Sequence, residues 1–181
     1  MKILTSTIRT FFTLILLLPV GTALAGEFST VINGKSFHVG SQETWNEKNY
    51  GLGIEYQFET ASKWKSLLVA NGFRDSHDNM SYMAGGGLHR NIFTSESLHG
   101  AYVDLGLNAF LMTRVGVNGG NPFPGALPSL TVGNRYIGIN VSYLPRAAIK
   151  RLTPKDSMDK NMKGVVFVQF KMSMSRLLPF Q

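Results

Sequence analysis

Two short segments of the sequence carry side chains that are suited to acid–base chemistry. His38 stands near the end of one predicted strand, and Asp75 and Ser76 follow the end of another. An imidazole can take a proton from a hydroxyl, a carboxylate can orient it, and a serine can act as a nucleophile or a hydrogen-bonding partner. Asp and Ser are also ordinary turn residues. Two interpretations stay open: a catalytic set for acyl transfer, or a polar turn beside a histidine at the rim.

The elements that must position these residues show a period of two. Leu52, Ile54, Tyr56 and Phe58 alternate with glycine, glutamate and glutamine, which is typical of a strand with one apolar face. After residue 25, no apolar run is long enough for a transmembrane helix and no helical period is sustained. Strands are predicted over residues 29–39, 50–60, 64–74, 79–90, 99–112, 127–133, 135–144 and 163–173.

The predicted fold class is all-β, an eight-stranded antiparallel transmembrane β-barrel. A closed barrel leaves no strand edge unpaired, and its apolar outer face can meet acyl chains. Strands of about ten residues in an even number are typical of such barrels. Alternation alone also fits a soluble lipocalin-like barrel or a sandwich, in which the two faces are reversed.

The first 25 residues resemble a cleavable secretory signal. Lys2 and Arg9 give a positive start, residues 11–20 are apolar, and Ala23-Leu24-Ala25 is a small-x-small cleavage site. Residues 26–181 then form a single predicted domain, because no linker or repeat divides them. The expected location is the bacterial outer membrane, with export through the signal peptide.

The charge balance points to anionic partners. The sequence has 18 Lys and Arg against 11 Asp and Glu, a net charge of +7, and no cysteine. An exported protein rarely meets nucleic acid, so we expect lipid or lipopolysaccharide phosphates as partners, unless the charge only aids solubility. No cofactor or metal site is expected, because His77, His89 and His99 are scattered and fit surface histidines better. A monomer is expected.

A lumen graded from apolar to polar follows from the strand order. If both chain ends are periplasmic, His38 and the Asp75-Ser76 pair emerge at the same outer rim. Inward residues of the outer half include Gly51, Gly53, Met83, Gly85, Phe110 and Met112, which are mostly small or apolar. Glu55 and Asp104 lie lower, where a lysine such as Lys65 can pair with them. We therefore expect a slim pocket for about one acyl chain, and not a pore.

The order of short motifs resembles the PagP-type outer-membrane lipid A palmitoyltransferases. That family carries an aromatic-His pair, an Asn-Glu-x-x-aromatic-Gly loop, Phe-Lys-Asp-Ser and Ala-Gly-x-Gly. This sequence has Phe37-His38, Asn46-Glu47-Lys48-Asn49-Tyr50-Gly51, Phe73-Arg74-Asp75-Ser76 and Ala84-Gly85-Gly86-Gly87. Two later proline-bearing segments, residues 127–133 and 141–145, resemble paired strands of the family. The likeness runs from about residue 36 to 145.

The resemblance implies transfer of a palmitoyl-type chain from a glycerophospholipid donor to lipid A or lipopolysaccharide. It implies that His38, Asp75 and Ser76 are the catalytic set, with His38 as general base and Asp75 as its polar support. It also implies that Gly87 sets the acyl length at the floor of a pocket that includes Gly85 and Met83. Strand parity likewise points Gly87 inward.

Two prolines are candidates for a lateral gate. Proline lacks the N–H of a ladder hydrogen bond, so Pro128 and Pro145 near strand ends can leave a gap that admits lipid sideways, or can merely mark loop boundaries. The resemblance favours the gate.

Some features depart from the family pattern. The segment before the first strand is too short for the family's amphipathic helix, and Asn33 and Asn49 replace expected prolines. Outer-membrane barrels in general usually end on an aromatic residue, and here the final residue is Gln181. Two other functions therefore stay open. One is a non-catalytic lipid-binding barrel, and the other is a lipid A deacylase or phospholipase in which water is the acceptor.

Overall fold

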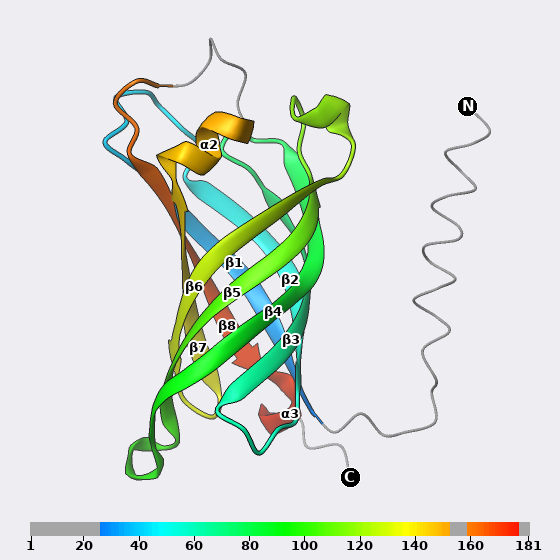
Figure 1. The fold of residues 1–181 in the computed structure, drawn as a ribbon, viewed down its shortest axis with the longest axis vertical. Helices are drawn as coiled ribbons and strands as arrows, with labels where there is room; N and C mark the ends of the chain where they lie inside the picture. Colours follow the sequence, from blue (N-terminus) through cyan, green and yellow to red (C-terminus); the bar gives the residue numbers. More distant parts are fainter. Residues whose placement is uncertain (1–25, 153–158, 178–181) are drawn as a thin grey trace, which may run out of the picture.

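A computed structural model describes residues 26–152 and 159–177, and the strands of these residues form a closed antiparallel barrel (Figure 1). The strands are β1 (Gly26–Val39), β2 (Lys48–Phe58), β3 (Trp64–Arg74), β4 (Met80–Ser95), β5 (Ala101–Thr113), β6 (Phe123–Gly133), β7 (Ile137–Pro145) and β8 (Gly164–Ser173). The helical turns are η1 (Glu96–Leu98), η2 (Asn118–Gly120), α2 (Arg146–Leu152) and α3 (Met174–Leu177). The predicted leader, residues 1–25, lies outside the described residues.

All eight predicted strands are confirmed, and β1, β4 and β6 are longer than the sequence pattern indicated. β4 continues to Ser95 because its pairing with β5 resumes after a register shift between Asn91 and Phe93. β6 begins at Phe123, which pairs with Met112 of β5. Prolines in this part of β6 interrupt the alternation, so its first residues did not resemble a strand.

The barrel closes where β1 pairs with β8, from Ser29 opposite Ser173 to Val39 opposite Gly164. Closure removes the free edges that an open sheet would present. The start of β1 and the end of β8 therefore lie at one end of the barrel, where α3 packs and Ser175 Oγ accepts a hydrogen bond from the N–H of Phe28. The loops after β1 and β3 lie at the other end (Figure 1).

The distribution of apolar and polar residues over the two faces of the strands distinguishes a lipid-facing barrel from a soluble one. Leu52, Ile54 and Leu107 point outward and are more than half exposed, whereas Glu55 and Asp104 point inward and are buried. A soluble barrel would show the reverse, because its apolar residues would fill the interior. The soluble alternative is thus wrong, and the chain is a transmembrane β-barrel. No helix of the described residues has the length and apolar character needed to cross a membrane.

Polar side chains fill the end of the lumen that lies away from the loops after β1 and β3. Lys65 Nζ lies 2.8 Å from Asp104 Oδ2, as predicted, while Glu55 pairs with Lys171 at 2.5 Å. His89 is buried in this interior and its Nε2 lies 2.9 Å from Asn108 Oδ1. The prediction of a surface position was wrong for His89. Two polar clusters complete the interior, one formed by Asn33, Asn71 and Gln169 and the other by Thr131 and Asn140.

Candidate active site

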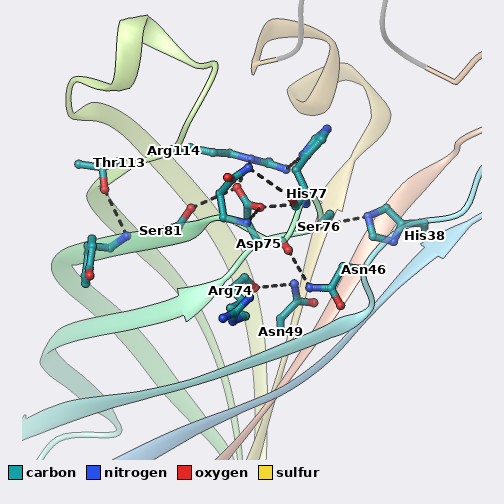
Figure 2. A network of polar contacts seen from close by, with 12 residues as sticks. His38, Asn46, Asn49, Arg74, Asp75, Ser76, His77, Ser81, Thr113 and Arg114 are labelled. Carbon is teal, nitrogen blue, oxygen red and sulfur yellow. Dashed lines mark hydrogen bonds and ion pairs between the residues drawn. The ribbon is translucent and has the colours of Figure 1, made fainter.

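The histidine and the serine meet at the loop end of the barrel. His38 Nε2 lies 3.0 Å from Ser76 Oγ, although the two residues stand 38 positions apart (Figure 2). A β-bulge makes this possible: the β1–β8 register shifts between Asn33 and Ser36, and both of these residues are buried in the interior. The bulge moves the inward face from odd to even positions, so that His38 also points into the barrel.

The loop after β1 holds Ser76 against His38. The backbone N–H of Asn46 donates to the carbonyl of Ser76 at 3.1 Å, and the Asn46 amide donates to the carbonyl of Asp75 at 3.1 Å. These bonds join the two loops directly (Figure 2). The Asn46-Glu47 motif therefore serves to fix the distance between imidazole and hydroxyl.

The imidazole of His38 is enclosed, because only 4% of its side chain is exposed. The ring of Trp45 stacks on it, with centroids 4.9 Å apart and planes inclined by 12°. Trp45 is held in turn, since its Nε1 donates to Ser41 Oγ at 2.7 Å, and Ser41 donates to Asp159 at 2.5 Å. His38 Nδ1 is buried and has no hydrogen-bond partner among the described residues; Glu47 Oε1 lies 3.8 Å away.

Asp75 organises the turn that carries Ser76. Its Oδ1 accepts from the backbone N–H groups of His77 and Asn79, at 2.8 and 3.0 Å. Its Oδ2 accepts from Arg114 Nε at 3.1 Å and from Ser81 Oγ at 3.4 Å. None of the hydrogen bonds found in residues 26–152 and 159–177 joins Asp75 to His38. The carboxylate thus acts on the turn and on Arg114.

Two residues that the sequence interpretation did not single out, Arg114 and Trp45, belong to this rim, and both contact His77. Arg114 follows the end of β5 and binds both Asp75 and the Nδ1 of His77, the latter at 3.0 Å. Trp45 contacts His77 edge to face, at 5.3 Å between centroids. The sequence offered a signal for Trp45, because this residue directly precedes the Asn46-Glu47 motif. It offered no comparable signal for Arg114. In the described part of the chain, no group of His, Asp and Glu side chains is arranged to hold a metal ion.

A cavity of about 550 Å³ runs from this rim into the barrel. Asp75, Ser76 and Arg114 line its upper end, and the amides of Asn108 and Gln169 line its lower end. Most of the wall between them is apolar and is formed by Phe73, Met83, Phe110, Met112, Leu144, Val165 and Phe167. The volume lies within the range of small-molecule sites. A slim apolar chain with a polar head fits this distribution.

The predicted pocket residues of β4 differ in their relation to the cavity. Met83 lines it directly, whereas Gly85 and Gly87 are not among the lining residues. Gly87 is opposite Asn108 of β5, and a Cβ at Gly87 would lie 2.1 Å from Asn108 Oδ1. Gly87 therefore affects the cavity indirectly. Because it has no side chain, there is room for the amide of Asn108, which lines the cavity.

The cavity reaches the side of the barrel between β6 and β7. Their pairing joins Ser129–Gly133 of β6 to Gly138–Ser142 of β7. It does not include Pro128 or the residues of β6 that precede it. Beyond that point, consecutive residues 124–127 of β6 line the cavity, together with Pro145 and residues 147 and 148 of α2. Pro128 itself is not a lining residue. Because both faces of β6 contribute here, the cavity extends around this strand segment.

The fold and the site define a class of protein: a transmembrane β-barrel of the outer-membrane type, with a largely apolar interior cavity lined at one end by a serine that contacts a histidine. A sequence model of the family described as "PagP: Antimicrobial peptide resistance and lipid A acylation protein PagP" matches residues 29–152. The chain belongs to this PagP family. The family and the barrel together indicate the bacterial outer membrane.

A curated relative is similar over part of its length. The chain is 31% identical over 104 residues to the lipid A acyltransferase PagP of Methylobacillus flagellatus. The aligned region covers 57% of this chain and 54% of the relative. The chain thus spans about half the length of the curated relative that it matches.

Proposed function

We propose that the protein transfers an acyl chain, of palmitoyl type, from a glycerophospholipid to lipid A in the outer leaflet. The observation that carries this proposal is the 3.0 Å contact between His38 Nε2 and Ser76 Oγ at the head of an apolar cavity. Membership of a lipid A acylation family and the similarity to a lipid A acyltransferase support it.

The proposed reaction exchanges one ester bond for another. The acyl chain of the donor lies in the cavity, with its ester at the rim. His38 takes the proton of the acceptor hydroxyl as this oxygen attacks the acyl carbon, and Ser76 positions the hydroxyl by a hydrogen bond or attacks first itself. The bond to the glycerol oxygen breaks, and His38 returns the proton to it. A lysophospholipid and an acylated acceptor are the products.

The remaining rim residues have supporting roles in this proposal. Asp75 fixes the turn of Ser76 and holds Arg114, which places a guanidinium at the head of the cavity. This charge is suited to a lipid phosphate. The gap between β6 and β7, beside Pro128 and Pro145, is the proposed route by which a donor lipid enters from the membrane.

The test is mass spectrometry of lipid A and phospholipids from cells that express the chain, compared with His38→Ala and Ser76→Ala. We expect lipid A to gain one C16 acyl group, and loss of the base to lower the rate by about 10²- to 10⁴-fold. Loss of acyl groups from lipid A or phospholipid without transfer would instead support the deacylase or phospholipase. Unchanged lipids with a folded barrel would leave the non-catalytic lipid-binding barrel and refute both enzymes.

A further inference from the structure

Two residues that line the cavity, and His38 close to it, carry buried polar atoms without partners. Ser36 Oγ, Asn49 Oδ1 and His38 Nδ1 are buried and have no hydrogen-bond partner among the described residues. Ser36 and Asn49 are each only 2% exposed, and both line the cavity. A buried hydroxyl without a partner costs stability, so its retention calls for a reason such as a ligand.

Ser36 and Asn49 line the cavity, and other polar groups of these two residues are already paired. Asn49 uses its amide nitrogen to donate to the carbonyl of Arg74 at 2.7 Å, which leaves its oxygen unused (Figure 2). Ser36 uses its backbone N–H to donate to the carbonyl of Glu47 at 3.0 Å, while its hydroxyl stays unpaired.

The position of Ser36 relative to His38 suggests what the hydroxyl binds. The two residues are separated by one pleat of β1, about 7 Å along the strand, and both point inward. An acyl ester whose reacting carbon lies beside His38 and Ser76 extends its chain down past Ser36. The methylene groups that pass Ser36 cannot accept a hydrogen bond, so the acceptor available to its hydroxyl is the ester carbonyl oxygen, which becomes negative during acyl transfer.

We propose that the Ser36 hydroxyl donates a hydrogen bond to the carbonyl oxygen of the acyl ester and stabilises its negative charge during transfer. This inference rests on the proposed function and adds a substrate-binding residue to it. Ser36 contacts substrate, whereas Ser76 contacts His38. The hydroxyl has no hydrogen-bond partner among the residues that the structure describes, so its contribution falls on catalysis and not on folding.

A matched pair of variants separates these roles. Ser29 is also buried with an unpartnered hydroxyl on β1, but it does not line the cavity. We expect Ser36→Ala to lower kcat for acyl transfer by about 10²- to 10³-fold, the usual effect of removing one oxyanion donor. Ser29→Ala should leave kcat unchanged, and neither variant should lower the thermal midpoint in detergent micelles. Ser36→Thr keeps the hydroxyl and should recover part of the rate.

A readout without turnover separates this inference from the proposed function. A phospholipid with a ¹³C-labelled acyl carbonyl is bound to His38→Ala, and its infrared carbonyl band is compared with that in His38→Ala/Ser36→Ala. The hydrogen bond should lower the frequency only in the first. The role of Ser36 would be overturned if Ser36→Ala kept the wild-type kcat and the carbonyl band were the same in His38→Ala and His38→Ala/Ser36→Ala. The proposed transferase would not be affected by that result. Absence of transfer by the unmodified chain would refute the transferase, and the infrared band would still decide whether Ser36 binds the carbonyl.

Discussion

The indole of Trp45 lies flat on the imidazole of His38, with 4.9 Å between the ring centroids. This stack covers one face of the proposed base, and the Nδ1 atom of the same imidazole has no hydrogen-bond partner among the described residues. In many acyl-transfer sites a hydrogen-bonded carboxylate orients the histidine. Here the orientation of His38 rests on ring stacking and on the contact with Ser76.

Removal of the indole should therefore lower the rate. We expect Trp45→Ala to lower kcat by up to about 10²-fold, because small displacements of a catalytic group have effects of this size. Trp45→Phe retains an aromatic ring but loses the hydrogen bond to Ser41. Its kcat should lie between those of the wild type and Trp45→Ala. Trp64, which is 49% exposed on β3, provides the control variant Trp64→Phe. A wild-type kcat in Trp45→Ala would show that the stack does not position His38.

The carboxylate of Asp75 should matter through the turn it holds. Asp75→Asn replaces one accepting oxygen by an N–H₂ group that faces donors, so we expect about 1–3 kcal/mol of destabilisation and a large loss of acyl transfer. Asp78 lies in the same turn but is exposed and pairs with Arg74 at the surface. Asp78→Asn should change the free energy of unfolding by less than about 1 kcal/mol. Equal effects of the two variants on stability and kcat would contradict the assigned role.

Gly87 should control the length of the transferred chain through Asn108. A Cβ at residue 87 would displace the Asn108 side chain from its place at the cavity floor. We expect Gly87→Ala to shift the acyl chains found on lipid A towards shorter ones when mixed donors are offered, measured by mass spectrometry. Gly86→Ala is the control, because its Cβ would be directed to the outer side, near Leu68. An unchanged length distribution in Gly87→Ala would refute the prediction.

Strand alternation was sufficient to predict the eight strands, but it fitted a soluble barrel as well as a membrane barrel. The strand order, with both chain ends taken to lie at one end of the barrel, predicted the shared rim of His38 and Ser76. Alternation did not predict the bulge after Asn33, because an extra residue changes the inward face without changing composition. Arg114 and Trp45 lie in loops or at strand ends, where side-chain direction depends on contacts that a period does not encode. His89 differs: it shares the inward parity of Gly87, so the same alternation contained the signal for its burial.

The anchor of Trp45 should persist down to strongly acidic pH. The hydrogen bond from Ser41, with help from backbone N–H groups, holds the pKa of Asp159 below its usual value of about 3.9. Its contribution to loop order is therefore complete above that value and is lost only as the pH falls through the lowered pKa. In a Trp64→Phe background, Trp45 fluorescence should change below about pH 3.9. In the same Trp64→Phe background, Asp159→Asn should change the Trp45 fluorescence already at neutral pH. Unchanged fluorescence in this variant would contradict the role of Asp159 in holding Trp45.

The gap between β6 and β7 should limit the entry of donor lipid. Pro128 directly precedes Ser129, where the ladder ends, and Pro145 lies three residues beyond Ser142 on β7; neither proline has an N–H to extend the ladder. Pro128→Ala/Pro145→Ala restores both donors, so we expect the strands to pair further and the side opening to narrow. Donor kcat/KM should fall by about 10-fold or more, corresponding to about 1.4 kcal/mol, while single-turnover chemistry from preloaded donor is retained.

The matched control for the gate is Pro122→Ala, which changes a proline of the same region outside β6. It should leave kcat/KM unchanged. Amide hydrogen exchange provides the structural readout, because continuing the β6–β7 register would pair residue 128 with Tyr143 and Ala126 with residue 145, and new ladder bonds should protect the N–H groups of Ala126 and Tyr143 in the double variant. Protection of these amides with an undiminished kcat/KM would show that lipid reaches the cavity by another route, since the opening would then be closed without consequence for uptake.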